Sequence, residues 1–179
     1  MSAFGQCLVF TTDAKGIQLF QLWQSQPAIF IFLRHFACIA CRAHAAQVWE
    51  SRARYEGSGG KIVFIGNGQP SFIEKFREDL GLTGALILTD PKRNAFRLVG
   101  FRDGFFYVVR PQSAMNAFQL AREGHRQTAY SSAGGTHWQL GGILVVSTAG
   151  EATYRYISES VGDFPEEKSL RFIQKNEGT

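Results

Sequence analysis

The most constraining feature of this sequence is an uninterrupted apolar stretch, Ala28–Leu33, inside a segment of strand length, Ala28–Arg34. Such a stretch is typical of a central strand that is buried on both faces of a parallel sheet. A helical pattern begins a few residues later, at Ile39. Because parallel strands need a crossover connection, usually a helix, this order predicts a sheet with a parallel centre and helices on its faces.

The other elements follow from apolar periodicity and from turn residues. We expect strands at Cys7–Thr11, Ala28–Arg34, Lys61–Ile65, Ala85–Thr89, Ile143–Ser147 and Ala152–Ile157. We expect helices at Ile17–Trp23 (one or two turns), Ile39–Glu56, from the capping box Ser71–Glu74 to a stop at Gly81, Asn94–Val99, Ser113–Glu123 and Pro165–Lys175. This order resembles the thioredoxin arrangement, an α/β fold with a central mixed β-sheet flanked by helices, here with an insertion between the two halves. The length fits a single thioredoxin-like domain over residues 1–179.

The middle of the chain is less regular. Phe105–Val109 is aromatic and β-branched, and it fits either a loop or a strand. Gly124–Gly142 is polar and rich in glycine, which predicts a long loop. Loops of that length inside a compact domain are usually functional or mobile.

Composition excludes several classes of protein. Hydrophobic residues make up 45% of the chain, which is incompatible with disorder over its whole length. The net charge of +4 is mild and the basic residues form no run, so we expect no nucleic-acid partner. No apolar stretch approaches the roughly 20 residues of a membrane span, and Met1–Phe10 lacks the features of a secretory signal. We therefore expect a cytoplasmic protein without a membrane partner.

The strongest chemical signal is a C-x-x-C pair, Cys38 and Cys41, at the predicted strand-to-helix turn. One helical turn brings residues i and i+3 onto one face, which suits a disulfide whose α-carbons must lie within about 7 Å. The free N–H groups and the positive end of the helix favour a thiolate there. Arg34 and Arg42 are close enough in sequence to add positive charge. The pair therefore predicts thiol redox chemistry.

Other interpretations of the pair remain open. In the first, the two cysteines are a buried pair without chemical activity. In the second, Cys38, Cys41 and His44 form a C-x-x-C-x-x-H motif, part of a zinc site that would need a fourth ligand. Cys7 is the one further cysteine and has no partner nearby in sequence. A c-type haem motif is excluded because Arg42 stands where that motif needs His. His35 and His44 are candidate proton donors, with a structural role as the alternative. We expect no metal and no organic cofactor.

Four motifs carry a family resemblance, and they are Phe32-Leu33-Arg34-His35-Phe36 leading into Cys38-x-x-Cys41-Arg42, Leu88-Thr89-Asp90-Pro91, Trp138-Gln139-Leu140-Gly141-Gly142, and Val161-Gly162-Asp163-Phe164-Pro165. With these motifs the chain resembles the peroxiredoxin-like branch of the AhpC/TSA family, the group that includes the prostamide/prostaglandin F synthase type. The resemblance extends over almost the whole chain, from about Cys7 to Ile173.

The resemblance implies that Cys38 and Cys41 are the redox pair and that Trp138–Gly142 packs beside them. Thioredoxins carry a cis-proline in that loop, where this chain has Gly141 and Gly142. Typical peroxiredoxins place Thr three residues before the peroxide-reacting cysteine, and that alignment points to Cys41. The synthase type and the position at the helix mouth point to Cys38. We expect Cys38 to attack first, and to be more exposed than Cys41.

Together these features predict a thiol-dependent oxidoreductase of the peroxiredoxin-like type. One thiolate attacks the O–O bond of a peroxide or the S–S bond of a disulfide, the second cysteine resolves the product, and a thioredoxin-like or other dithiol donor restores the pair. The alternative is a non-catalytic or slow redox-sensing binding module of the same fold. The predicted catalytic residues are Cys38 and Cys41, and the predicted supporting residues are Arg34, His35, Arg42, Trp138, Gly141 and Gly142.

Overall fold

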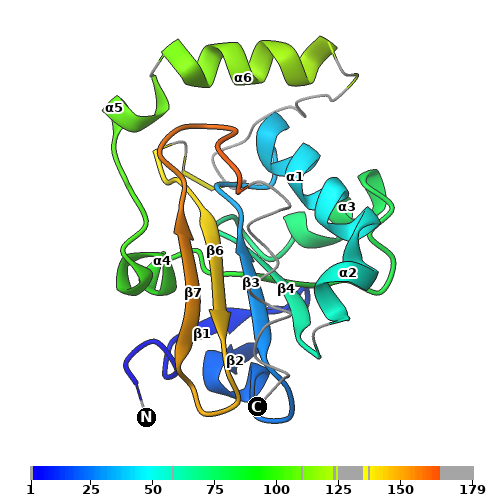
Figure 1. Cartoon of the computed structure of the whole chain (residues 1–179), viewed down its shortest axis with the longest axis vertical. Helices are drawn as coiled ribbons and strands as arrows, with labels where there is room; N and C mark the ends of the chain where they lie inside the picture. Colours follow the sequence, from blue (N-terminus) through cyan, green and yellow to red (C-terminus); the bar gives the residue numbers. More distant parts are fainter. Residues whose placement is uncertain are drawn as a thin grey trace.

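The computed structural model describes residues 2–57, 59–109, 111–122, 124, 135–136 and 138–165, and these residues form a seven-stranded sheet with helices on both faces (Figure 1). The strands are β1 (Leu8–Phe10), β2 (Gly16–Gln18), β3 (Ala28–Phe32), β4 (Lys61–Gly66), β5 (Leu86–Thr89), β6 (Gly142–Val146) and β7 (Ala152–Ile157). Their order across the sheet is β2-β1-β5-β4-β3-β6-β7. β3, β4 and β5 are parallel, and every other pairing is antiparallel. The predicted α/β fold with a mixed thioredoxin-like sheet is confirmed.

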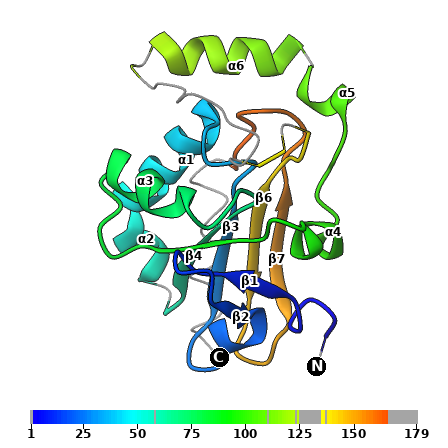
Figure 2. The ribbon, with the colours of Figure 1, turned by 180° about the vertical axis from the view of Figure 1, so that it is seen from behind.

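The helices divide between the two faces of this sheet. They are η1 (Leu19–Leu22), α1 (Ile39–Glu50), α2 (Arg52–Glu56), α3 (Phe72–Asp79), α4 (Asn94–Val99), α5 (Phe105–Val108) and α6 (Pro111–Arg122). α1, α2 and α3 cover one face, and η1 and α4 cover the other, as the view from behind shows (Figure 2). α4, α5 and α6 lie between β5 and β6 in sequence, where the insertion was predicted.

The central strand β3 explains why the sheet needs cover on both sides. All five of its residues are buried, and side chains alternate between the faces of a strand. Ile29 and Ile31 therefore join the core under α1, α2 and α3, whereas Phe30 and Phe32 join the core under η1 and α4. Burying each such side chain contributes about 1.5–3 kcal/mol relative to exposure. The apolar stretch seen in the sequence is thus the shared wall of two cores.

Several predicted elements differ in detail from the structure. The predicted helix Ile39–Glu56 is divided at Ser51, which leaves the helical conformation and ends α1. The predicted capping box is wrong, because Ser71 makes no side-chain cap and already has helical backbone angles. Ile17–Trp23 begins as the edge strand β2 before its 3-10 turn. Phe105–Val109 forms the short helix α5 instead of a loop or strand.

α6 lies across the end of the sheet at which β3 runs into α1 (Figures 1 and 2). It contacts α1, and it is joined by hydrogen bonds to the segment after β7. The Ser113 hydroxyl accepts a bond from the Val161 N–H at 3.1 Å, and the Asn116 amide donates to the Val161 carbonyl at 2.9 Å. The insertion therefore packs on the same end of the molecule as the cysteine pair.

Two sequence predictions concern segments mostly outside the described residues. They are the final helix at Pro165–Lys175 and most of the long loop at Gly124–Gly142. Among the described helices, none has the length and apolar character needed to cross a bilayer.

Candidate thiol redox site

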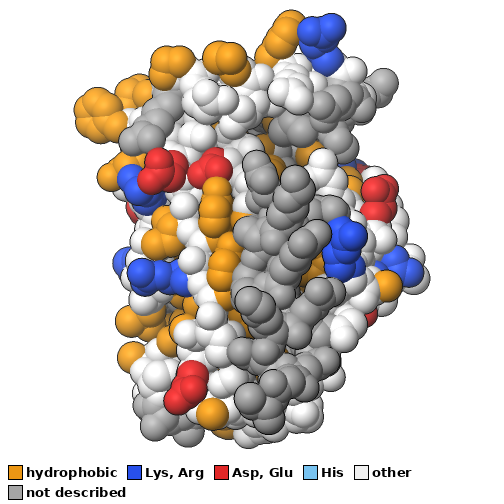
Figure 3. Space-filling model, viewed as in Figure 1, with side chains coloured by type: hydrophobic (Ala, Val, Ile, Leu, Met, Phe, Trp, Pro, Cys, Tyr) orange, Lys and Arg blue, Asp and Glu red, His pale blue; other side chains and the backbone are white. Residues whose placement is uncertain are grey.

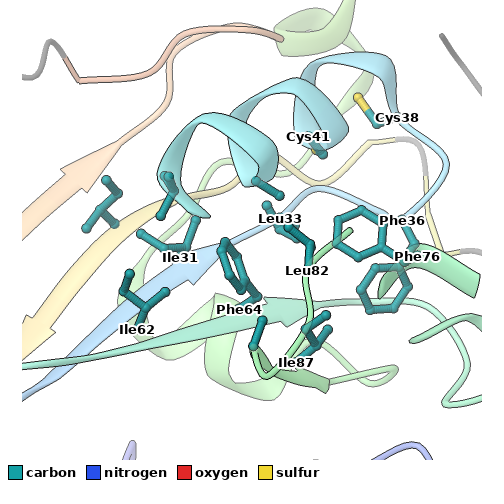
Figure 4. Packing of buried hydrophobic residues seen from close by; sticks show 14 of the residues in the cluster. Ile31, Leu33, Phe36, Cys38, Cys41, Ile62, Phe64, Phe76, Leu82 and Ile87 are labelled. Atoms are coloured by element: carbon teal, nitrogen blue, oxygen red, sulfur yellow. The ribbon is translucent and has the colours of Figure 1, made fainter. Parts of the chain in front are cut away.

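The C-x-x-C pair lies where β3 ends and α1 begins, at the carboxyl edge of the parallel strands. Cys38 is the residue that precedes α1, with extended backbone angles, and Cys41 lies in the first turn of that helix. A tight turn leads into it, since the Cys38 N–H donates to the His35 carbonyl at 3.2 Å. Figure 4 shows both side chains at the end of α1, beside the packed rings of Phe36 and Phe76. Both cysteines are free thiols.

Arg34 contacts both sulfur atoms. Its Nη1 lies 3.6 Å from Cys38 Sγ, and its backbone N–H donates to Cys41 Sγ at 3.2 Å. One residue thus supplies a positive charge to the first thiol and a neutral donor to the second. A charge beside the first sulfur favours its thiolate form.

The surroundings separate the pKa values of the two thiols. A hydrogen bond from the Cys41 thiol, with the charge of Arg34 adding to it, lowers the pKa of Cys38 to about 6 despite burial. Burial, together with the hydrogen bond to Cys38, raises the pKa of Cys41 well above its ordinary value. At neutral pH this arrangement gives one thiolate and one protonated thiol, the pair that nucleophilic attack followed by resolution requires.

The prediction that Cys38 is the more exposed of the two is wrong. Cys38 is 3% exposed and Cys41 is 6% exposed, so both are buried. A cavity of about 20 Å³ lies beside Cys41, large enough for about one water molecule. Its other walls are Phe32, Leu33, Arg34, Ala40, Leu140, Gly141, Ser158, Ser160, Val161, Gly162 and Phe164.

Sequence reasoning gave no site role to the turn at residues 158–164, which forms much of that wall. Asp163 holds the turn together, because its carboxylate accepts bonds from the Tyr156 hydroxyl at 2.5 Å and from the Glu159 N–H at 2.7 Å. The Ser158 hydroxyl donates to the Asp163 carbonyl at 2.8 Å. Gly162 has a φ of +80°, and an added Cβ would lie 2.9 Å from Asn116 Cβ on α6. The signal was present in the sequence as the motif Val161–Pro165 of the family resemblance.

Gly141 and Gly142 allow β6 to approach β3 beside the pair. A Cβ on Gly141 would lie 1.9 Å from the Phe32 carbonyl oxygen, and one on Gly142 would lie 2.0 Å from the Tyr156 carbonyl oxygen. Any side chain would therefore push two backbones apart. In the register of the sheet, Gly142 stands opposite Phe32. Gly141 also lines the cavity beside Cys41.

His35 and Trp138 occupy different positions in this region. His35 is buried, and a Cβ on Gly135 would lie 3.0 Å from its Cβ, so the loop before β6 passes over it. The Trp138 ring packs against Phe105 of α5, with centroids 5.2 Å apart, and is 41% exposed. Trp138 therefore joins the loop to the insertion.

The prediction that Arg42 supports the thiols is wrong. Its guanidinium turns toward α3, where it forms a salt bridge with Asp79 at 3.2 Å and lies 6.0 Å from the Phe76 ring centroid. Arg42 thus ties α1 to α3. The helix direction decides this, because successive side chains of a helix point about 100° apart and only one face of α1 can meet the thiol turn.

His44 is a buried neighbour of the pair. Its ring stacks on Phe164, with centroids 3.8 Å apart, and burial lowers the pKa of the imidazole to about 3. His44 is therefore neutral and packs against Phe164, the last residue of the 158–164 turn. Within the described residues, no three His, Cys, Asp or Glu side chains gather as metal ligands.

Known proteins resemble this chain in sequence and in fold. The profile described as AhpC/TSA antioxidant enzyme matches residues 48–160, a range that begins after the cysteine pair. The chain is 32% identical over 164 residues to the chloroplastic thioredoxin-like protein AAED1 of Arabidopsis thaliana, covering 86% of this chain and 64% of that protein's length. It is 25% identical over 162 residues to a prostamide/prostaglandin F synthase of Salmo salar, covering 89% and 80% respectively.

A solved structure shares the fold. The peroxidoxin BcpB of Mycobacterium tuberculosis superposes with a TM-score of 0.67 at 14% identity, covering 94% of this chain and 91% of that one. The family profile covers more than half of the chain, and the superposed structure has the same fold. The chain belongs to the AhpC/TSA antioxidant enzyme family and has the peroxiredoxin-like fold, which is a fold of thiol oxidoreductases.

Proposed function

We propose that this chain reduces a peroxide, or a disulfide, with Cys38 as the attacking thiolate and Cys41 as the resolving thiol. The observation that carries the proposal is the unequal pair at the end of α1. Arg34 holds both sulfurs, and the pKa of Cys38 falls to about 6 while that of Cys41 rises. The substrate class comes from the family, in which antioxidant thiol chemistry is the common activity.

The first step uses the Cys38 thiolate. Its sulfur attacks one oxygen of a hydroperoxide, the O–O bond breaks, and the departing alkoxide or hydroxide takes up a proton to leave as alcohol or water. Cys38 becomes a sulfenic acid, two electrons more oxidised. Arg34 lies near enough to stabilise the negative charge as it moves from sulfur to oxygen.

The second step uses Cys41, one helical turn further on. Its sulfur attacks the Cys38 sulfenic acid, an S–S bond forms and water leaves. A donor dithiol then attacks the disulfide, forms a mixed disulfide and releases the pair as two thiols, while the donor becomes oxidised. With a disulfide substrate, the first step gives a mixed disulfide with Cys38 and releases one substrate thiol. Cys41 then attacks the Cys38 sulfur and releases the second substrate thiol in place of water, and the donor restores the pair as before.

The test is steady-state turnover with hydrogen peroxide, a bulkier organic hydroperoxide and a small disulfide, each with dithiothreitol and with thioredoxin as donor. Cys38→Ser is expected to lose at least about 100-fold in rate with every substrate. Cys41→Ser, oxidised and then given a small thiol, is expected to hold a mixed disulfide at Cys38 that mass spectrometry detects. Cys7→Ser is the matched control and is expected to keep its rate within about twofold. Cys7 directly precedes β1, and β5 and β4 lie between β1 and β3 in the sheet.

The opposite outcome assigns the roles differently. If Cys38→Ser reacts rapidly with peroxide while Cys41→Ser is inert, then Cys41, which adjoins the small cavity, is the attacking residue. One observation also favours a second function, a slow redox sensor, since both thiols are buried. A sensor would form the disulfide once per oxidant exposure, without turnover in the presence of excess donor.

A further inference from the structure

Large apolar side chains gather on one exposed surface of the molecule. Of the eight large hydrophobic residues that are exposed in the described chain, six lie on α5, directly after α5, on α6 or in the loop before β6. Figure 3 shows hydrophobic side chains along the upper end, where α5 and α6 lie, with a basic side chain beside them. We call this the α5–α6 surface, and its members are Phe105, Phe106, Val109, Met115, Phe118 and Trp138.

α6 divides its residues between this surface and the molecule. Met115 and Phe118, 64% and 67% exposed, lie three residues apart on the outer side, and Arg122 follows with its guanidinium 5.9 Å from the Phe118 ring centroid. Ser113 and Asn116 face inward and bind Val161. A groove of about 540 Å³ runs along the helix beside Met115 and Phe118.

The inward side of α6 connects the surface to the thiols. Val161 belongs to the 158–164 turn, which forms a wall of the cavity beside Cys41. α6 also contacts α1, whose first turn carries the pair. Both thiols are buried, so a protein thiol reaches them only if it docks at this end and displaces the residues that cover them. The α5–α6 surface is an exposed apolar area of the described chain at that end (Figure 3).

We propose that the α5–α6 surface is the docking site for the protein dithiol that reduces the Cys38–Cys41 disulfide. This inference rests on the proposed function and deepens it. The partner presents an apolar surface around its own thiols and an acidic rim. The donor thiolate attacks one sulfur of the disulfide, its second thiol releases the mixed disulfide, and two electrons pass from donor to chain.

The chemistry of the surface selects this partner. Aromatic residues, Met and Arg are enriched in the centres of protein interfaces. Arg122 at the edge of the groove has no carboxylate partner within the described chain, and the chain carries a net charge of +4, which favours an acidic rim opposite. Helices that lie on membrane surfaces are rich in Lys and Arg on their polar side, whereas Pro111–Arg122 contains Arg122 alone. A second copy would bring like charges together, and its own Cys38 and Cys41 are buried.

The experiment compares two donors on the full chain. The double variant Met115→Glu, Phe118→Glu is assayed with thioredoxin and with dithiothreitol, and Leu98→Glu serves as control, because Leu98 is 52% exposed on α4 outside the surface. We expect the ratio of thioredoxin-supported kcat/KM to dithiothreitol-supported rate to fall at least about tenfold in the double variant and to stay unchanged in the control. An unchanged ratio in the double variant overturns the docking site.

A direct binding measurement separates this proposal from the proposed function. A thioredoxin with both active-site cysteines replaced by Ser, which cannot form a mixed disulfide, is titrated against the oxidised chain, and the Kd is expected to rise about tenfold in the double variant whether or not turnover occurs. If the wild-type chain shows no turnover with either donor, the proposed function fails, and this Kd still decides the docking site. An equal Kd overturns it. Met115→Gln with Phe118→Gln replaces the double variant if circular dichroism shows misfolding.

Two further measurements test whether a second copy of the chain or a membrane binds the α5–α6 surface instead. In analytical ultracentrifugation we expect the wild type and the double variant to sediment alike. A wild-type dimer that the double variant converts to monomer would assign the surface to a second copy and overturn the proposal. In sedimentation with vesicles of anionic phospholipid we expect the chain to stay in solution. Pelleting that the double variant abolishes would assign the surface to a membrane and overturn it as well.

Discussion

Two neighbouring regions at one end of this molecule are built in opposite ways. At the thiol site, Cys41, the two residues Leu140 and Gly141 before β6, and the 158–164 turn leave a cavity of only about 20 Å³. On the α5–α6 surface, at the same end of the molecule, Phe106 is 81% exposed and Phe118 is 67% exposed. The first region excludes solvent and fixes distances, whereas the second offers apolar area to a partner.

The difference shows how one end of a fold serves both chemistry and recognition. A thiolate whose pKa is lowered needs a fixed charge and fixed donors, and only close packing holds those in place. A transient interface needs exposed aromatic area at some cost in solubility. α6 separates the two, because its inner side binds Val161 and its outer side carries Met115 and Phe118.

The largest expected effect is at the point of closest packing in the thiol site. Gly141→Ala places a Cβ 1.9 Å from the Phe32 carbonyl oxygen, and both atoms belong to backbone. We expect a loss of about 3 kcal/mol or more in the free energy of unfolding, measured by urea denaturation. Gly16→Ala is the control, because its nearest atom is a Leu8 side-chain carbon at 3.6 Å, and it is expected to change stability by less than about 1 kcal/mol.

A pH-dependent effect is expected from His44. Burial lowers the pKa of its imidazole from 6.5 to about 3, so the unfolded chain binds a proton there that the folded chain does not. The contribution of neutral His44 to stability is complete above pH 6.5 and is lost as pH falls from 6.5 toward 3, with a slope of up to about 1.4 kcal/mol per pH unit. His44→Leu is expected to flatten this slope in thermal unfolding. An equally steep slope in the variant would place the acid sensitivity in other groups.

A smaller effect is expected from the charge beside the thiol. Alkylation of Cys38 by iodoacetamide is expected to follow a midpoint near pH 6 in the wild type, because Arg34 helps to lower the pKa of that thiol. Arg34→Met is expected to raise the midpoint and to slow alkylation at pH 6.5 by about tenfold. Lys75→Met, a charge removed from an exposed site on α3, keeps the wild-type profile. A midpoint near pH 9 in the wild type would contradict the separation of the two thiols.

The smallest effect is expected on the α5–α6 surface. Phe106→Ser removes a large ring, yet that ring is 81% exposed in the folded chain. We expect the free energy of unfolding to change by less than about 0.5 kcal/mol. A loss of several kcal/mol would mean that the ring packs against part of the protein in solution, and it would remove the contrast between the two regions.

The sequence alone predicted the elements that depend on local patterns. An apolar stretch of strand length followed by a C-x-x-C pair on a helix defined the β3–α1 unit, and the parallel centre of the sheet followed from the order of strands and helices. The helix boundaries were less well predicted, as Ser51 and Ser71 show. End residues respond to tertiary contacts, so propensity and capping motifs fix them poorly.

What only the tertiary structure decided were choices between partners far apart in sequence. Arg34 and Arg42 looked alike beside the pair, but the first meets both sulfurs and the second meets Asp79. The 158–164 turn lies beside Cys41, and α6 forms a hydrogen bond with that turn. These residues are far apart in sequence, so a helical or strand periodicity does not predict their contact. A local pattern sets which face of an element is apolar, because neighbours in sequence repeat at the helical or strand period. Which group then lies opposite depends on the packing of whole elements. That packing placed the Arg34 charge beside Cys38 and left Met115 and Phe118 of α6 exposed.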